Sequence, residues 1–474
     1  MKKVILPLMA ICLSFSACMG KSYKRPIIDL PANTVTGDNT VNKDIASFEN
    51  VKWWNIFQDI VLDKMEDEAL KYNQDLKMAM ARVAESKAKL SVTRASLYPT
   101  LDLTGNAGDS KSIQNLKDNG FLSSRYTVGL AVSYEVDLWG KYIRASESAK
   151  SDFLSSQSDR DAVKLTLTAD VAKTYFQLKA LDSQLAIAQT TLSSREESYN
   201  VYNNRFQKGI ISELDLRRVE AEMESVRAQV YTVENYVKIA ETSLSILIGR
   251  NPRAIIEEGV ERGNKIEDII VIPQIPTAVP SDLIARRPDI KKMEWTLKSA
   301  NAQIGSAKAA LFPSISLTGF GGVASYELED LFKDDKDTWS YSGDIVIPIF
   351  HGGKIFKNYE ATKAQYEQML ASYQKTIQVA FKEVLDAINT YQLGQKTLAA
   401  REKQTLALKK SYELSVKREK SGLADLLDVL DVERMLLQAQ IDLATAQQDQ
   451  LNATVDICRT LGGGWTEEKG FENK

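Results

Sequence analysis

The chain has 474 residues, enough to bury a large core, and its 44% hydrophobic and 26% charged residues are typical of a folded protein. A formal net charge of −3 provides no basic field of the kind that nucleic acid requires, so no nucleic-acid partner is expected. The sequence holds one histidine and lacks a phosphate-binding glycine loop, a metal-ligand cluster and an elbow-type nucleophile, which argues against an enzyme and against a metal site.

Residues 1–17 have the order of an export signal. Lys2 and Lys3 precede an apolar run, and small residues lead to Cys18. The run holds about 12 residues, whereas a spanning helix needs about 20. Cys18 resembles the cysteine of the bacterial lipobox, so we expect a covalent N-terminal lipid there and no other cofactor. Residues 18–50, rich in Pro, Thr, Asn and Asp, are predicted to form a lipidated, extended tether.

The sequence repeats itself. The stretch LYPTLDLTG at 97–105 returns as LFPSISLTG at 311–319. Further parallels relate 73–80 to 287–294, 139–150 to 352–363 and 205–220 to 418–433, all offset by 213 or 214 residues. This spacing predicts a tandem duplication, with a first structural repeat over 51–270 and a second over 271–474.

Each repeat is predicted to begin with a helix followed by two strands. Apolar residues recur every three or four positions over 60–97 and 281–311, and a proline follows each stretch. The clearest strand is YTVGLAVSYEVDL at 126–138, where apolar and polar residues alternate, and its counterpart is WSYSGDIVIPIF at 339–350.

Two very long helices follow the strands. Residues 142–207 and 355–420 contain no proline, and at about 1.5 Å per residue each helix would extend about 100 Å. Gly209 and Gly422 are expected to end them. Shorter helices return from these turns, and such antiparallel pairs indicate a packed helical bundle or a coiled coil; they cover 213–248 and 424–461.

A strand with one apolar face and one polar face suits a wall between lipid and water, although one such strand alone is more typical of an ordinary sandwich. Four strands cannot close a barrel, and unpaired edges in lipid are prohibitive. We therefore expect copies of the chain to complete the wall, with eight strands in a dimer or twelve in a trimer.

The sequence resembles the TolC-type outer-membrane efflux family, in its OprM/NodT-like lipoprotein branch. The phrases that carry the resemblance are YKRP, WWNIFQD, PSDLIARRPDI, GSAKAALFPSISLTG, the two RxxxG turns and LLDVLDVER. They extend from about Tyr23 to Gly463. The resemblance implies a mostly α member of the α+β class: a homotrimer with a twelve-stranded β-barrel in the outer membrane, continuous with a barrel of long periplasmic helices.

The resemblance also implies a function. The protein would be the outer-membrane exit duct of a tripartite pump, passively conducting small molecules from an inner-membrane transporter of RND type through a periplasmic adaptor. Two alternatives remain open: an exit duct for type I protein secretion, and a lipid-tethered periplasmic coiled-coil scaffold. The scaffold leaves the four alternating strands without a role.

The acidic residues after the second glycine turn match the constriction of the family. Asp428 and Asp431, with the neighbouring Leu427, are predicted to form the periplasmic gate, and three chains would bring six carboxylates together. In the first repeat their equivalents are Asp215 and Arg218, so we expect the two tips to differ and the second to form the inner gate.

The two turns themselves are assigned to the periplasmic tip and to adaptor docking. The residues of this assignment are Arg205, Gly209, Asp215, Arg418, Gly422 and Asp425. For Asp425 we favour a simpler role as a carboxylate that caps the N-terminus of the returning helix.

Overall fold

The computed structural model describes residues 22–26, 52–112, 121–252, 259–269 and 286–463. The predicted signal peptide, Cys18 and most of the tether lie outside these residues. The chain divides into two compact units: the first holds Met1–Ile28, Arg82–Gln157 and Lys292–Lys375, and the second holds Asp29–Ala81, Ser158–Lys291 and Thr376–Lys474. Each unit thus combines segments of both sequence repeats.

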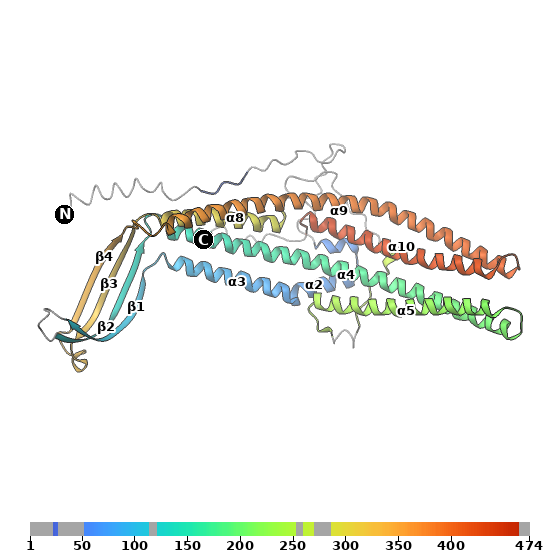
Figure 1. The fold of residues 1–474 in the computed structure, drawn as a ribbon, viewed down its shortest axis with the longest axis horizontal. Coiled ribbons are helices and arrows are strands. Elements are labelled where there is room, and N and C mark those ends of the chain that lie inside the picture. Colours follow the sequence, from blue (N-terminus) through green and yellow to red (C-terminus); the bar gives the residue numbers. More distant parts are fainter. Residues whose placement is uncertain (1–21, 27–51, 113–120, 253–258, 270–285, 464–474) are drawn as a thin grey trace. The chain divides into compact units, whose positions relative to one another are not determined.

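The elements follow one another in the predicted order (Figure 1). In the first repeat they are η3 (Trp53–Phe57), α2 (Ile60–Tyr72), α3 (Gln74–Ala95), β1 (Thr100–Ser112), β2 (Phe121–Val136), α4 (Lys141–Gln207), α5 (Glu213–Leu247) and η4 (Ile266–Asp268). In the second they are α8 (Pro288–Ala309), β3 (Ser314–Ser325), η5 (Leu328–Asp330), β4 (Asp337–Val346), α9 (Lys354–Lys420) and α10 (Leu426–Thr460). In the part of the chain that the structure describes, no helix has both the length and the apolar character that crossing a membrane requires.

The prediction of one helix over 60–97 is wrong at Asn73, where α2 ends and α3 begins. The backbone of Asn73 leaves the helical region with ψ of 135°, and its amide still donates to the carbonyl of Ala69. Its side-chain oxygen accepts from the amide of Leu76 at 2.9 Å, while its side-chain amide donates to the carbonyl of Leu247. The side chain of Asn73 therefore caps the N-terminus of α3 and binds the last carbonyl of α5, while its backbone amide closes the end of α2.

The four strands form one antiparallel sheet in the order β1-β2-β3-β4, as Figure 1 shows. Pairing between β2 and β3 joins the hairpin of the first repeat to the hairpin of the second. Gly129 and Gly322 are partners there, and a Cβ on Gly129 would lie 2.7 Å from the Cα of Gly322, so these positions admit no side chain. Among the described residues, β1 and β4 are edge strands with a partner on one side only.

One face of the sheet is apolar from edge to edge. Directly paired residues share a face, and Leu101 pairs with Val132 while Leu103 pairs with Leu130. The other members of this face are Tyr134, Val136, Ile315, Leu317, Trp339, Tyr341 and Ile345. The opposite face carries mostly polar residues, among them Asp102, Thr104, Ser133, Glu135, Ser316, Thr318, Ser342 and Asp344. An apolar face of this size, with Leu103 75% exposed, requires a covering other than water.

The first unit also contains the junction between strands and helices. The carboxylate of Asp137 accepts from the amides of Tyr142 and Ile143 at 3.0 and 2.8 Å and so caps α4. Trp139 stacks on Phe312, with ring centroids 4.9 Å apart, and its Nε1 donates to the carbonyl of Pro313 at 2.7 Å. These contacts tie the start of α4 to the α8–β3 connection.

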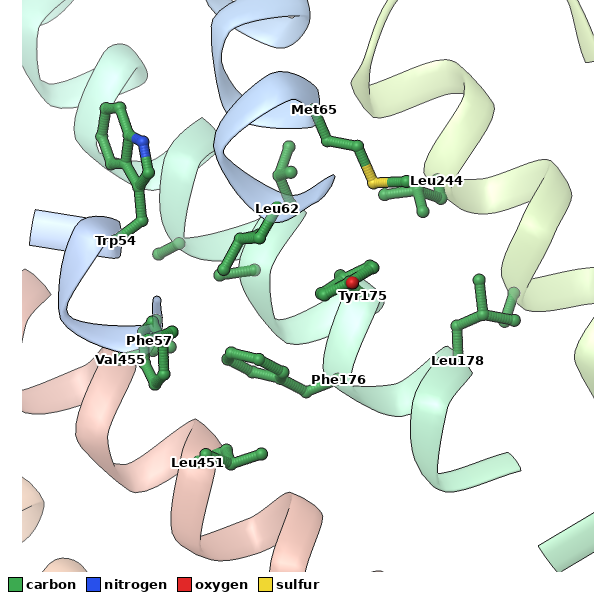
Figure 2. Packing of buried hydrophobic residues seen from close by; sticks show 14 of the residues in the cluster. Trp54, Phe57, Leu62, Met65, Tyr175, Phe176, Leu178, Leu244, Leu451 and Val455 are labelled. Carbon is green, nitrogen blue, oxygen red and sulfur yellow. The ribbon is translucent and has the colours of Figure 1, made fainter. Parts of the chain in front are cut away.

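The second unit has the main hydrophobic core, shown in Figure 2. Aromatic residues of η3 fill its centre, and the rings of Phe57 and Phe176 lie 4.7 Å apart. Leu244 of α5 and Val455 of α10 close the cluster from the returning helices. Cys458 is buried in it at 3% exposure and acts as a small hydrophobic residue.

Candidate gate and tip contacts

Both long helices end in the same glycine turn. Gly209 and Gly422 have φ of +72° and +71°, a left-handed conformation that costs a residue with a Cβ about 1–2 kcal/mol. In each turn the amide of the next residue donates to the carbonyl of Arg205 or Arg418, at 2.9 and 2.8 Å. The predicted glycine caps of both helices are therefore confirmed.

The arginine side chains of the two turns have different partners. Arg205 lies over the ring of Tyr202 at 5.1 Å and pairs with Glu419, which belongs to the other hairpin, at 3.6 Å. Arg418 instead donates to the carbonyl of Leu423 at 3.3 Å, within its own turn. The first turn is thus connected to the second through Arg205.

A small hydrophobic cluster joins the two hairpins near their turns. Tyr202, Leu216 and Val219 of α4 and α5 pack with Leu430 of α10. The Tyr202 hydroxyl donates to Glu419 at 3.1 Å. Burial, together with the nearby carboxylate of Glu419, raises the pKa of Tyr202 to about 12, so the hydroxyl keeps its proton and remains a donor.

A buried ion pair forms a second connection between the hairpins. Arg195 of α4 is 1% exposed, and its Nε lies 3.1 Å from the carboxylate of Glu433 on α10. Tyr412 of α9 donates to the same carboxylate at 3.4 Å. Burial raises the pKa of Glu433, and the charge of Arg195 opposes this shift. Removing either partner would leave an uncompensated charge in a buried site.

The predicted gate residues occupy the first two turns of α10. Leu427 and Asp431 are four positions apart and Asp428 lies between them, so the three share one side of the helix. Leu427 is 43% exposed, and both carboxylates are exposed in the single chain. Asp431 accepts from Arg434 at 2.7 Å on the same helix. The structure brings these residues together, and their role as a gate stays a prediction.

The two returning helices begin differently. The Ser212 hydroxyl accepts from the amide of Asp215 at 3.3 Å and donates to its carboxylate at 2.6 Å, which caps α5. Asp425 occupies the corresponding position of α10, but its side chain makes no capping hydrogen bond. The expectation that Asp425 caps this helix is correct in position and wrong in hydrogen bonding.

Sequence reasoning missed the residues that connect the hairpins, namely Arg195, Tyr202, Glu419 and Glu433. One signal was present in the duplication, because the residue that corresponds to Arg195 in the second repeat is Leu408. A charge at a position where the other copy has an apolar residue indicates a buried partner. Among the residues that the structure describes, no three potential metal-ligating side chains gather as a metal site.

A family model described as "Outer membrane efflux protein" matches residues 66–250 and 279–463, one segment in each repeat. The chain belongs to the outer membrane efflux protein family. TtgC of Pseudomonas putida, described as a probable efflux pump outer membrane protein, is 31% identical over 481 residues, which cover 100% of this chain and 98% of TtgC.

Other members of the family extend the likeness. CusC of Escherichia coli, described as a cation efflux system protein, is 30% identical and covers 96% of this chain and 98% of its own. The crystal structure of the CmeC outer membrane channel of Campylobacter jejuni superimposes with a TM-score of 0.87 over 96% of each chain, at 26% identity.

Membership of the outer membrane efflux protein family confirms several expectations from the sequence. The fold is α+β and mostly α, the protein resides in the outer membrane, and it is the outer-membrane exit channel of an efflux pump, not an enzyme. The alternative of a periplasmic scaffold is set aside, because the match includes the strand-forming segments of both repeats.

Proposed function

We propose that this outer membrane efflux protein works as a homotrimer, whose twelve strands close a β-barrel in the outer membrane that continues into a barrel of periplasmic helices. The four-stranded sheet supports this most strongly, because it has two edge strands and one exposed apolar face. In lipid each unpaired backbone group costs several kcal/mol, and barrels need about eight strands or more. Three copies supply twelve strands and leave no edge.

The helices and their turns form the periplasmic part of this proposal. α4 and α9 have 67 residues each, so each extends about 100 Å at about 1.5 Å per residue, long enough to reach far into a periplasm. We assign both glycine turns to the contact with a periplasmic adaptor, and an inner-membrane transporter of RND type completes the pump. The assigned residues are Arg205, Gly209, Asp215, Arg418, Gly422 and Asp425.

The gate of the proposed trimer consists of Leu427, Asp428 and Asp431. Three copies would place six carboxylates around one axis, where like charges repel each other and attract cations. Both carboxylates are exposed in the single chain, so the other copies can approach them, although Asp431 also pairs with Arg434 on its own helix. Closure of the duct would then depend on how far apart the carboxylates of the three chains lie.

A lipid on Cys18 and small solutes as cargo complete the proposal. The lipid would hold the N-terminus at the membrane in which the strands lie. CusC is described as part of a cation efflux system and TtgC as part of an efflux pump, which supports small solutes over secreted polypeptides.

Two measurements test the proposed function. Native mass spectrometry of detergent-solubilised protein should give three chains, and a single folded chain or a dimer would contradict the trimer.

The conductance of planar bilayers tests the gate. Asp428→Ala combined with Asp431→Ala should raise this conductance. Glu402→Ala combined with Glu413→Ala, at exposed sites on α9, serves as the control and should leave it unchanged. Equal conductance in both double variants would rule out the gate.

A further inference from the structure

The polar face of the sheet carries one aromatic side chain. Phe320 pairs with Ala131 of β2 and with Ser340 of β4, and directly paired residues share a face. Among the residues of this face whose side chains the structure describes, Phe320 is the only aromatic one. In the proposed barrel the apolar face meets lipid, so the polar face and Phe320 line the water-filled lumen.

The ring of Phe320 leans along the sheet toward Gly129. A Cβ on Gly129 would lie 2.7 Å from Cζ of Phe320, so the tip of the ring occupies the space that a side chain at Gly129 would take. Gly129 is buried as a result, whereas Ser133 on the same face of β2 is exposed. Since Phe320 itself is partly exposed, one side of its ring rests on the backbone and the other side faces the lumen.

A carboxylate lies next to this ring. Asp102 of β1 pairs with Ala131, which places it in the same row across the sheet as Phe320. Gly129, under the tip of the ring, pairs with Thr104, so Asp102 is a diagonal neighbour of Gly129 at about 7–8 Å. Asp102 is exposed. An aromatic surface and a negative charge therefore lie within the span of one small ligand.

The other charges of the polar face are paired or lie farther from the ring. Glu135 forms an ion pair with Lys141 at 3.0 Å. Asp344 on β4 and Arg125 on β2 each lie four residues along their strands from the positions that flank the ring, which is about 14 Å. The charge next to the ring is therefore the carboxylate of Asp102.

The width of the proposed lumen makes each ring a separate contact. Strands about 4.8 Å apart and tilted by about 40° give a twelve-stranded barrel a radius of about 12 Å. At this radius the Phe320 residues of three copies lie about 20 Å apart at the wall, so water and small solutes pass between them. The ring therefore retains solutes that bind it and does not close the path.

The first repeat lacks both groups. The residue of β1 that matches Phe320 is Asn106, and the residue of β3 that matches Asp102 is Ser316. The strand pattern therefore requires neither the ring nor the carboxylate. The two groups come together only where β1, β2 and β3 lie side by side, once in each chain.

We propose that Phe320 and Asp102 form a contact site in the lumen for organic cations that carry an aromatic group. The ring of Phe320 stacks with the aromatic group, and the carboxylate of Asp102 attracts the positive charge. This inference rests on the proposed trimeric channel and adds a preference for one class of small solute as its cargo.

Block of the ionic current by organic cations tests the ring. The full chain with Asp428→Ala and Asp431→Ala in planar bilayers is the parent, because its gate is expected to be open. Benzyltrimethylammonium should halve the potassium chloride current at a concentration about two- to fivefold lower than tetramethylammonium does. Phe320→Ala should remove this difference, and Phe320→Tyr should keep it. Tyr341→Ala, which removes an aromatic ring from the apolar face, is the control and should keep it too.

The carboxylate is tested by replacing it with an amide. Asp102→Asn should raise the half-blocking concentration of both cations about threefold, because it removes a charge about 7 Å from the bound cation. Asp344→Asn, which removes a more distant carboxylate of the same face, should raise it less, since salt screens charges at that distance. Equal effects of the two variants would overturn the role of Asp102.

A further ring variant separates binding from folding. Phe320→Leu still covers Gly129 but has no aromatic face, so it should leave the current without a blocker unchanged and lose the preference for benzyltrimethylammonium. Equal block by the two cations in the parent, or the parent's preference in both Phe320→Leu and Phe320→Ala, would overturn the contact site alone. A parent that carries no current would overturn the proposed channel and, with it, the contact site.

Discussion

The two helical hairpins, α4–α5 and α9–α10, have the same backbone and different side-chain contacts. In both, a helix of 67 residues is followed by one of 35, and the glycine turns differ by one degree in φ. Yet Ser212 caps one returning helix while Asp425 leaves the other without a side-chain cap. Duplication has kept what the backbone requires, whereas the polar groups around the turns have diverged.

The divergence concentrates in the contacts that join the hairpins. Arg195 and Arg205, both on α4, reach Glu433 and Glu419 of the second repeat. The second hairpin carries the proposed gate, and groups of the first hairpin hold its position. Equivalent places in a repeat are therefore no guide to equivalent roles.

The largest effect is expected at the buried ion pair. Arg195→Ala leaves Glu433 buried without its partner and should lower the free energy of unfolding by about 3–5 kcal/mol. Denaturant unfolding of the detergent-solubilised protein measures this loss. Leu408→Ala, at the matching and only partly buried position of the second repeat, is the control and should cost much less. Equal losses would show that the two hairpins do not differ here.

A stabilising change is expected at Glu66 of α2, in the first repeat. Its side chain is fully buried, neither carboxylate oxygen has a hydrogen-bond partner, and burial raises its pKa well above 4.5, with Asp67 and Asp63 adding to the shift. A raised pKa means that stability is lost as the pH rises through it. Glu66→Met should therefore stabilise the protein by about 1–3 kcal/mol at alkaline pH, and less toward pH 4.5.

The pH dependence of unfolding provides the readout for Glu66. Glu68→Met, at a neighbouring residue whose carboxylate pairs with Arg250, is the control and should bring no such gain. A gain at Glu66 that does not change with pH would show that packing alone, and not ionisation, causes it.

Matching losses are expected at the two glycine turns. Gly209→Ala and Gly422→Ala each place a Cβ in a left-handed conformation, where the surrounding space is open, so each should cost about 1–2 kcal/mol. The denaturant concentrations at which the two variants are half unfolded should agree. A clear inequality would show that the turns are not equivalent even in their backbone.

The smallest effect separates the two turn arginines. Arg205→Ala removes an exposed ion pair to the other hairpin and a contact with Tyr202, and should cost about 0.5–1 kcal/mol. Arg418→Ala removes a contact within one turn and should cost less. Thermal unfolding midpoints rank the two variants. A lower midpoint for Arg418→Ala than for Arg205→Ala would contradict the role of Arg205 in connecting the hairpins.

Most helices and strands of the fold could be predicted from local patterns in the sequence. Strand alternation, the absence of proline over the long helices, and Gly209 and Gly422 gave the elements to within a few residues at most ends. The break at Asn73 was hidden because apolar spacing continues across it, and its side chain binds the carbonyl of Leu247 in α5, a partner 174 residues away that no local pattern indicates. The partner of Arg195 lies more than 200 residues away, so no local pattern could reveal it.

The close glycine contact between β2 and β3 has a consequence for assembly. Gly129 and Gly322 let the hairpins of the two repeats meet within one polypeptide, so that this seam forms during folding and needs no encounter between molecules. In the proposed trimer only the seams between β1 and β4 of successive chains remain to be made. If two ancestral half-length chains were fused, a barrel of six chains became a barrel of three. The number of seams between separate chains, at which strands can pair out of register, was thereby halved.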